Sequence, residues 1–74
     1  MVFDRVKEII VAQLKVEPDA VKPETFFIED LGADSIDVMD MIASLEAEFS
    51  KEVEEESLGE LKQVKDVVNY FEGL

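Results

Sequence analysis

The stretch that decides the fold of this 74-residue chain is residues 35–49, which read SIDVMDMIASLEAEF. Apolar side chains recur there at intervals of three and four residues, the spacing that places them on one face of an α-helix. The pattern therefore predicts a helix over residues 35–49 that buries this face in a core. The apolar face consists of Val38, Met41, Ile42, Leu45 and Phe49.

The residues at the start of this segment favour the same helix. Asp34 stands directly before it, where a short acidic side chain can accept a hydrogen bond from the first free N–H groups. Asp37 occupies the third helical position, the place of the second acid in a capping box. We therefore expect Asp34 to be the N-cap of the helix.

Three further segments carry helical patterns. Residues 3–15 and 64–71 each hold an apolar stripe at helical spacing, and Gly73 suits the end of the second stripe. A shorter apolar pattern indicates one helical turn near residues 56–61, and the lack of alternating runs argues against a sheet. The predicted fold is all-α: a small four-helix bundle with three longer helices and one short third helix. The stripe positions are Phe3, Val6, Ile10 and Leu14, then Leu58 and Leu61, then Val64, Val67, Val68 and Phe71.

A long connection, residues 16–33, joins the first two predicted helices. Pro18 and Pro23 break helical structure there, and Gly32 marks a turn. We expect this loop to be packed rather than flexible, because it carries its own apolar anchors. The anchors are Val16, Val21, Phe26, Phe27, Ile28 and Leu31.

Composition excludes several classes of protein. The chain has no Cys and no His, so it is not a disulfide scaffold, a zinc finger, a thiol enzyme or a histidine-based catalyst. Seven basic residues against 19 acidic ones give a net charge of −12, which argues against nucleic acid or an anionic membrane as partner. The longest apolar run, residues 9–12, is too short for a membrane span. We expect a single domain over residues 1–74 that is monomeric and cytoplasmic.

Most of the negative charge lies in residues 29–60, where twelve acids face one base, Lys51. Such a segment can serve solubility alone, or it can attract basic partners electrostatically. Ile36, Met39 and Ala43 fall largely opposite the apolar face of the central helix, among these acids. They are either ordinary apolar surface residues, some of them packed under the long loop, or the centre of a docking face with an acidic rim.

Ser35 opens the central helix and has three interpretations. It is a common helix-start residue, a nucleophile, or a modification site. The nucleophile interpretation is poor, because the chain has no His and Lys51 is the sole base nearby in sequence. A phosphate ester on Ser35 would face the free N–H groups and the positive end of the helix dipole.

The longer string around Ser35 is similar to a known attachment motif. Residues 29–37 read EDLGADSID, which resembles the Gly-x-Asp-Ser-Leu motif of acyl carrier proteins, with Ile36 in place of the Leu. The resemblance extends over nearly the whole chain and implies a four-helix bundle with a long first loop. Lys15 departs from the family pattern, because it stands where a helix-ending Gly is common. The other matching segments are residues 5–10, 13–14, 45–49 and 67–71.

The resemblance implies a non-catalytic carrier. Ser35 would receive a 4′-phosphopantetheine arm from coenzyme A through a separate Mg²⁺-dependent phosphopantetheinyl transferase. The thiol of the arm would carry acyl chains as thioesters between enzymes of fatty acid biosynthesis that have basic docking patches. The alternatives are a specialised carrier for polyketide or aminoacyl units and, in a different class, an unmodified acidic helical adaptor that binds basic proteins or Ca²⁺.

The resemblance also implies roles for three sets of residues, and Asp34 would flank the cofactor. The neutral Ala47 interrupts the acidic rim where many members carry a further acid. Partner enzymes would contact Asp34, Ile36, Asp37, Met39, Asp40, Ala43 and Glu46. The acyl chain would be sheltered by Phe27, Val38, Met41, Ile42, Leu45 and Leu61. Weak binding of a divalent cation is implied at Glu29, Asp34 and Asp37, with Glu46, Glu52 and Glu55 as further candidates.

Overall fold

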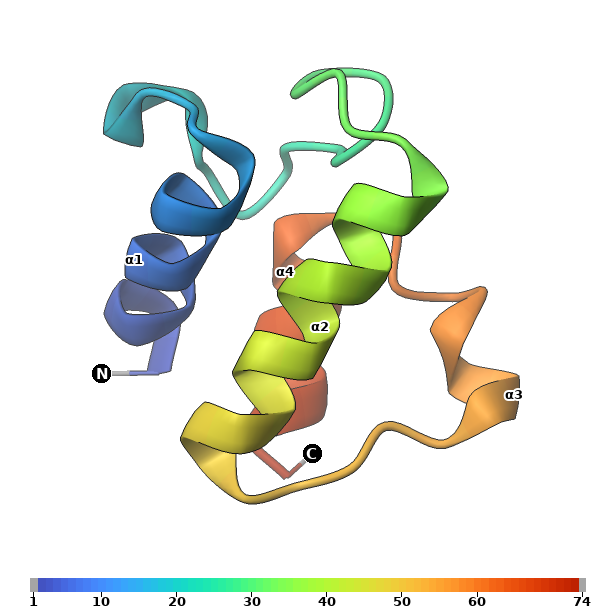
Figure 1. Ribbon diagram of the computed structural model, residues 1–74. Coiled ribbons are helices and arrows are strands. Elements are labelled where there is room, and N and C mark those ends of the chain that lie inside the picture. Colours follow the sequence, from blue (N-terminus) through green and yellow to red (C-terminus); the bar gives the residue numbers. More distant parts are fainter. Residues whose placement is uncertain (1, 74) are drawn as a thin grey trace.

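The computed structural model describes residues 2–73 and has four α-helices in that range (Figure 1). They are α1 (Val2–Leu14), α2 (Ser35–Phe49), α3 (Glu55–Leu58) and α4 (Val64–Phe71), and a 3₁₀ helix, η1 (Pro18–Ala20), lies in the long connection. Residues 2–73 contain no strand, apart from one isolated bridge described below. The predicted all-α bundle with a short third helix is confirmed. The two terminal residues of the predicted domain lie outside the described range.

The core forms where α1 packs against both α2 and α4 (Figure 1). Three of the five residues predicted for the apolar face of α2 are buried, and the partly buried Phe49 stacks on Phe71 with ring centroids 5.3 Å apart. The one-turn helix α3 lies to the side of this core, and none of its residues is buried. The fully buried helix residues are Val6, Ile10, Met41, Leu45, Val64 and Val67.

The predicted cap of α2 is present. The Asp34 carboxylate accepts a hydrogen bond from the N–H of Asp37 (2.8 Å), and the Asp37 carboxylate accepts one from the N–H of Asp34 (3.2 Å). At the other end Ser50 adopts a left-handed conformation with φ 52°. Lys15, which follows α1, is also left-handed at φ 56°, which explains why glycine suits its position.

The long connection is packed, as predicted, and it is tied to the start of α4. Phe27 is buried at 1% exposure, and its N–H donates to the carbonyl of Lys62 (3.1 Å). The N–H of Val64 donates to the carbonyl of Thr25 (2.9 Å), and Phe26 forms an antiparallel bridge with Gln63. These bonds fix the connection to the residues at the start of α4.

One predicted anchor is wrong: Ile28 is 55% exposed. The chain reverses tightly after Phe26, whose carbonyl accepts from the N–H groups of Asp30 and Leu31. In this turn Phe27 takes the position that faces the core, whereas its neighbour Ile28 lies outside the core, on the wall of a cavity described below. The short helix also begins one residue earlier than expected and ends at Leu58, and Leu61 follows it as a buried residue.

Two sets of polar contacts join the elements. Arg5 on α1 donates to both carboxylate oxygens of Glu48 on α2, through Nε (2.8 Å) and Nη2 (2.9 Å), and through Nη1 to Glu8 (2.6 Å). The hydrogen bond from Arg5 lowers the pKa of Glu48 below its ordinary value.

Lys51 and Tyr70 form the second set, in which Lys51 Nζ donates to the Tyr70 carbonyl (2.8 Å). The Tyr70 hydroxyl accepts from the N–H of Glu54 (3.0 Å), so the segment between α2 and α3 is fixed to α4.

No helix within residues 2–73 is long and apolar enough to cross a lipid bilayer.

Candidate functional site

Ser35 is the first residue of α2, and it is exposed. The capping box uses the N–H groups of Asp34 and Asp37, and the first backbone bond of the helix runs from the N–H of Val38 to the carbonyl of Asp34. Among residues 2–73 no acceptor is found for the N–H groups of Ser35 and Ile36. The Ser35 hydroxyl therefore stands at a helix start that still has free donors for an anion.

The contacts of Ser35 within residues 2–73 do not equip it as a nucleophile. Its hydroxyl makes no hydrogen bond with another residue of the described chain. The one base predicted to be near in sequence, Lys51, lies beyond the far end of α2 and is bonded to Tyr70. The described structure therefore shows no base bonded to Ser35 that would activate its hydroxyl.

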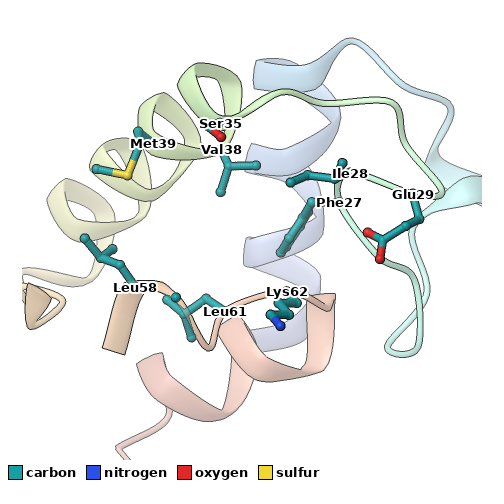
Figure 2. Close-up of a pocket in the computed structure, with 10 residues that line it drawn as sticks. Phe27, Ile28, Glu29, Ser35, Val38, Met39, Leu58, Leu61 and Lys62 are labelled. Atoms are coloured by element: carbon teal, nitrogen blue, oxygen red, sulfur yellow. The ribbon is translucent and has the colours of Figure 1, made fainter. Parts of the chain in front are cut away.

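A cavity of about 500 Å³ lies beside Ser35 (Figure 2). The long connection forms one wall, the first turns of α2 form another, and the segment from α3 to the start of α4 closes the third side. Six of its ten lining residues are apolar, and one of the polar ones is Ser35 itself. The complete lining is Phe27, Ile28, Glu29, Ser35, Val38, Met39, Leu58, Gly59, Leu61 and Lys62.

The structure divides the six residues predicted to shelter an acyl chain into two groups. Phe27, Val38 and Leu61 line the cavity beside Ser35. The other three, Met41, Ile42 and Leu45, are buried in the core and do not line it. Ile28 and Leu58 also line the cavity and were not predicted to do so, although the apolar pair Leu58 and Leu61 is visible in the sequence.

The outer face of α2 is apolar at its centre. Ile36 is 71% exposed and Met39 is 50% exposed, and Ala43 is exposed as well. Neither Ile36 nor Met39 is covered by the long connection, so the alternative in which they pack beneath it is wrong. Met39 extends from this face to the cavity and belongs to both.

The acids of this face differ in what they contact. Asp40 is exposed, and none of the hydrogen bonds in the described part of the chain involves its side chain. The carboxylates of Asp34 and Asp37 are exposed but accept the capping hydrogen bonds. Glu46 is partly buried, and its Oε2 accepts from the N–H of Val53 (2.7 Å), so this acid holds the segment after α2.

The acids predicted to bind a divalent cation are not gathered into a ready site. Within residues 2–73 no three Asp or Glu side chains are placed so that they could hold a metal ion together. Binding of a cation at Glu29, Asp34 and Asp37 stays a prediction.

Comparison with known proteins decides the family. A family described as "Phosphopantetheine attachment site" matches residues 4–71 of this chain. The chain belongs to the acyl carrier protein family. It is 51% identical to the acyl carrier protein of Campylobacter fetus over 73 residues, which cover 99% of this chain and 95% of the relative. It is 50% identical to that of Helicobacter hepaticus (95% and 92% covered) and 48% identical to that of Bdellovibrio bacteriovorus (96% and 91%).

The cofactor of this carrier family is 4′-phosphopantetheine, attached covalently. The residues around Ser35 fit the group. An exposed hydroxyl is available for a phosphodiester bond, two unpaired N–H groups stand at the same helix start, and an apolar cavity lies alongside. The chain has no cysteine of its own, so a thiol can come only from the cofactor.

Proposed function

We propose that Ser35 is the residue to which 4′-phosphopantetheine is attached. The chain is an acyl carrier protein that serves fatty acid biosynthesis and is itself not a catalyst. When bound, the cofactor supplies a thiol that holds acyl groups as thioesters. The observation that supports Ser35 most directly is its exposed hydroxyl, at the start of α2 and on the rim of the apolar cavity.

A separate phosphopantetheinyl transferase performs the attachment in this proposal. No hydrogen bond joins the Ser35 hydroxyl to a basic side chain within residues 2–73, and in this proposal the chemistry comes from the transferase and its Mg²⁺. The protein's contribution is to present the hydroxyl at a fixed place, because the mutual capping of Asp34 and Asp37 defines where α2 begins.

Partner enzymes bind the docking face, which we define as Asp34, Ile36, Asp37, Met39, Asp40, Ala43 and Glu46. Its apolar centre supplies contact area, and the surrounding acids attract a basic patch on the partner. Because 11 of the 12 net negative charges fall in residues 29–60, the attraction is strong at low salt and is screened as salt is added.

The cavity beside Ser35 shelters the acyl chain in this proposal. Phe27, Val38 and Leu61 provide its apolar walls. Met41, Ile42 and Leu45 become part of the site only if a long chain displaces core contacts, since these three side chains are already buried among their neighbours.

The remaining properties follow from the same assignment. We propose that residues 1–74 act as one carrier domain, that the protein is a cytoplasmic monomer and that nucleic acid is not a partner. A carrier for polyketide or aminoacyl units would use the same serine and would differ in the loaded thioester that is recovered from cells. An unmodified acidic adaptor would keep the docking face and would have no use for Ser35.

The test compares two serines of the same helix region. The full chain is incubated with coenzyme A, Mg²⁺ and a phosphopantetheinyl transferase of broad specificity, and intact mass is measured. We expect a gain of one phosphopantetheine group, lost in Ser35→Ala and retained in Ser50→Ala. Ser50 is the matched control, because it is exposed and lies at the opposite end of α2. No gain in the unaltered chain, or a gain retained in Ser35→Ala, would contradict the proposal.

A further inference from the structure

Met39 belongs to two surfaces at once. Its side chain lines the cavity beside Ser35, and half of it is exposed on the outer face of α2. Figure 2 shows the side chain leaving α2 on the side that faces Leu58, with the thioether sulfur at the edge of the cavity. Reagents in solution therefore have access to a residue that also forms part of the cavity wall.

Met41, two positions further along the same helix, provides an internal contrast. It is fully buried in the hydrophobic core. Peroxides oxidise the methionine thioether to a sulfoxide, and the sulfur must be accessible for this reaction. Met41 can react only when the core opens, whereas Met39 can react in the native state.

We propose that Met39 is a site of oxidation by peroxides, and that its sulfoxide weakens the use of this face by partner enzymes. One oxygen atom passes from hydrogen peroxide to the sulfur. A sulfur–oxygen bond forms, the peroxide oxygen–oxygen bond breaks, the sulfur loses two electrons and the reduced peroxide leaves as water.

The surroundings of Met39 explain why the sulfoxide matters. Oxidation turns a flexible apolar side chain into a polar hydrogen-bond acceptor. Of the side chains that line the cavity, those of Ser35 and Lys62 carry hydrogen-bond donors, and most of the others are apolar. When an acyl chain fills the cavity or an apolar partner surface covers the face, the sulfoxide at position 39 loses its hydrogen bonds to water, and this loss is costly where its new neighbours are apolar. This effect on partners rests on the proposed function.

The chemical half of the inference is tested on the full chain in dilute hydrogen peroxide, with the sulfoxide at each methionine quantified by tandem mass spectrometry. We expect Met39 to react at least about tenfold faster than Met41, because Met41 depends on opening of the core. In urea the two rates should become equal. Equal rates in the native protein, or a faster reaction at Met41, would overturn the assignment.

The functional half is tested through modification of Ser35 by the transferase. Each protein is compared with its own untreated sample, and Met39→Leu is the matched variant because it keeps Met41 and Met1. We expect peroxide to lower kcat/KM of the unaltered chain by about threefold or more and to leave that of Met39→Leu unchanged. An unchanged kcat/KM in a sample with a fully oxidised Met39 would overturn this half. If no phosphopantetheine were transferred to the untreated protein, the proposed function would be contradicted. The oxidation rates of Met39 and Met41 would still decide whether Met39 is the site of oxidation.

Discussion

The two halves of α2 use similar residues in different ways. In the C-terminal half, Glu46 and Glu48 are bonded to the rest of the protein, one to the N–H of Val53 and the other to Arg5. In the N-terminal half, Asp40 is free of such bonds and Ile36 is 71% exposed. The two halves have similar acidic compositions, so composition does not show which acids are available to a partner. The contacts of each side chain must be known before a function is assigned to it.

The largest effect should come from the buried side of the helix. Leu45→Ala removes a fully buried side chain and leaves a cavity, so we expect a loss of about 2–5 kcal/mol of unfolding free energy. Ile36→Ala, on the exposed side, should change stability by less than about 0.5 kcal/mol. Urea denaturation followed by circular dichroism measures both. Comparable losses in the two variants would mean that Ile36 is part of the core.

The start of α2 should show the next largest effect. Asp34→Ala removes the N-cap and should cost about 1 kcal/mol. Asp40→Ala is the control: it lies on the same exposed half but caps nothing, so its effect should stay within about 0.5 kcal/mol. The same urea titrations decide the question, and an Asp34→Ala variant as stable as the unaltered chain would show that the capping box does not define the helix start.

The end of α2 offers a gain in stability. Ser50 is held at φ 52°, a conformation that costs a side-chain-bearing residue free energy and costs glycine little. Ser50→Gly should therefore raise the unfolding free energy by about 0.5–1 kcal/mol. Thermal unfolding at fixed salt is the measurement, and a lowered melting temperature would contradict the left-handed cap.

The smallest effect concerns the bond between α1 and the C-terminal half of α2. Because Arg5 lowers the native pKa of Glu48 below its ordinary value of 4.5, the ionised form of Glu48 stabilises the fold above that pH. This contribution is lost as pH falls through the lowered native pKa. Glu48→Gln should therefore be slightly less stable than the unaltered chain at pH 7, and the difference should vanish in acid. Glu60→Gln makes the same change of net charge at an exposed acid. If both variants responded to pH alike, the Arg5 contact would contribute nothing specific.

The sequence was sufficient for the features that depend on local periodicity and capping. The core face of α2, its N-cap and the helical positions of α1 and α4 follow from spacing alone, and the structure confirms them. The features that were missed depend on contacts between distant segments. The carbonyl of the buried Thr25 accepts a hydrogen bond from the N–H of Val64, and the Tyr70 hydroxyl accepts one from the N–H of Glu54.

The candidate site shows the same division. Motif and resemblance singled out Ser35, which stands where a cofactor can be attached. Which apolar residues line the cavity did not follow, because the turn after Phe26 places Phe27 in the core and leaves Ile28 largely exposed while both line the cavity, and no one-dimensional pattern specifies that arrangement. Met39, assigned to the docking face alone, was likewise found to belong to the cavity as well.

The most direct test of the account is the intact mass of this protein purified from the cells that make it, followed by fragmentation to locate any added group. The account predicts a population heavier by one phosphopantetheine group, with the added mass on Ser35 and part of it extended by acyl chains. A population that carries no added mass under every growth condition, or one modified at a different residue, would contradict it.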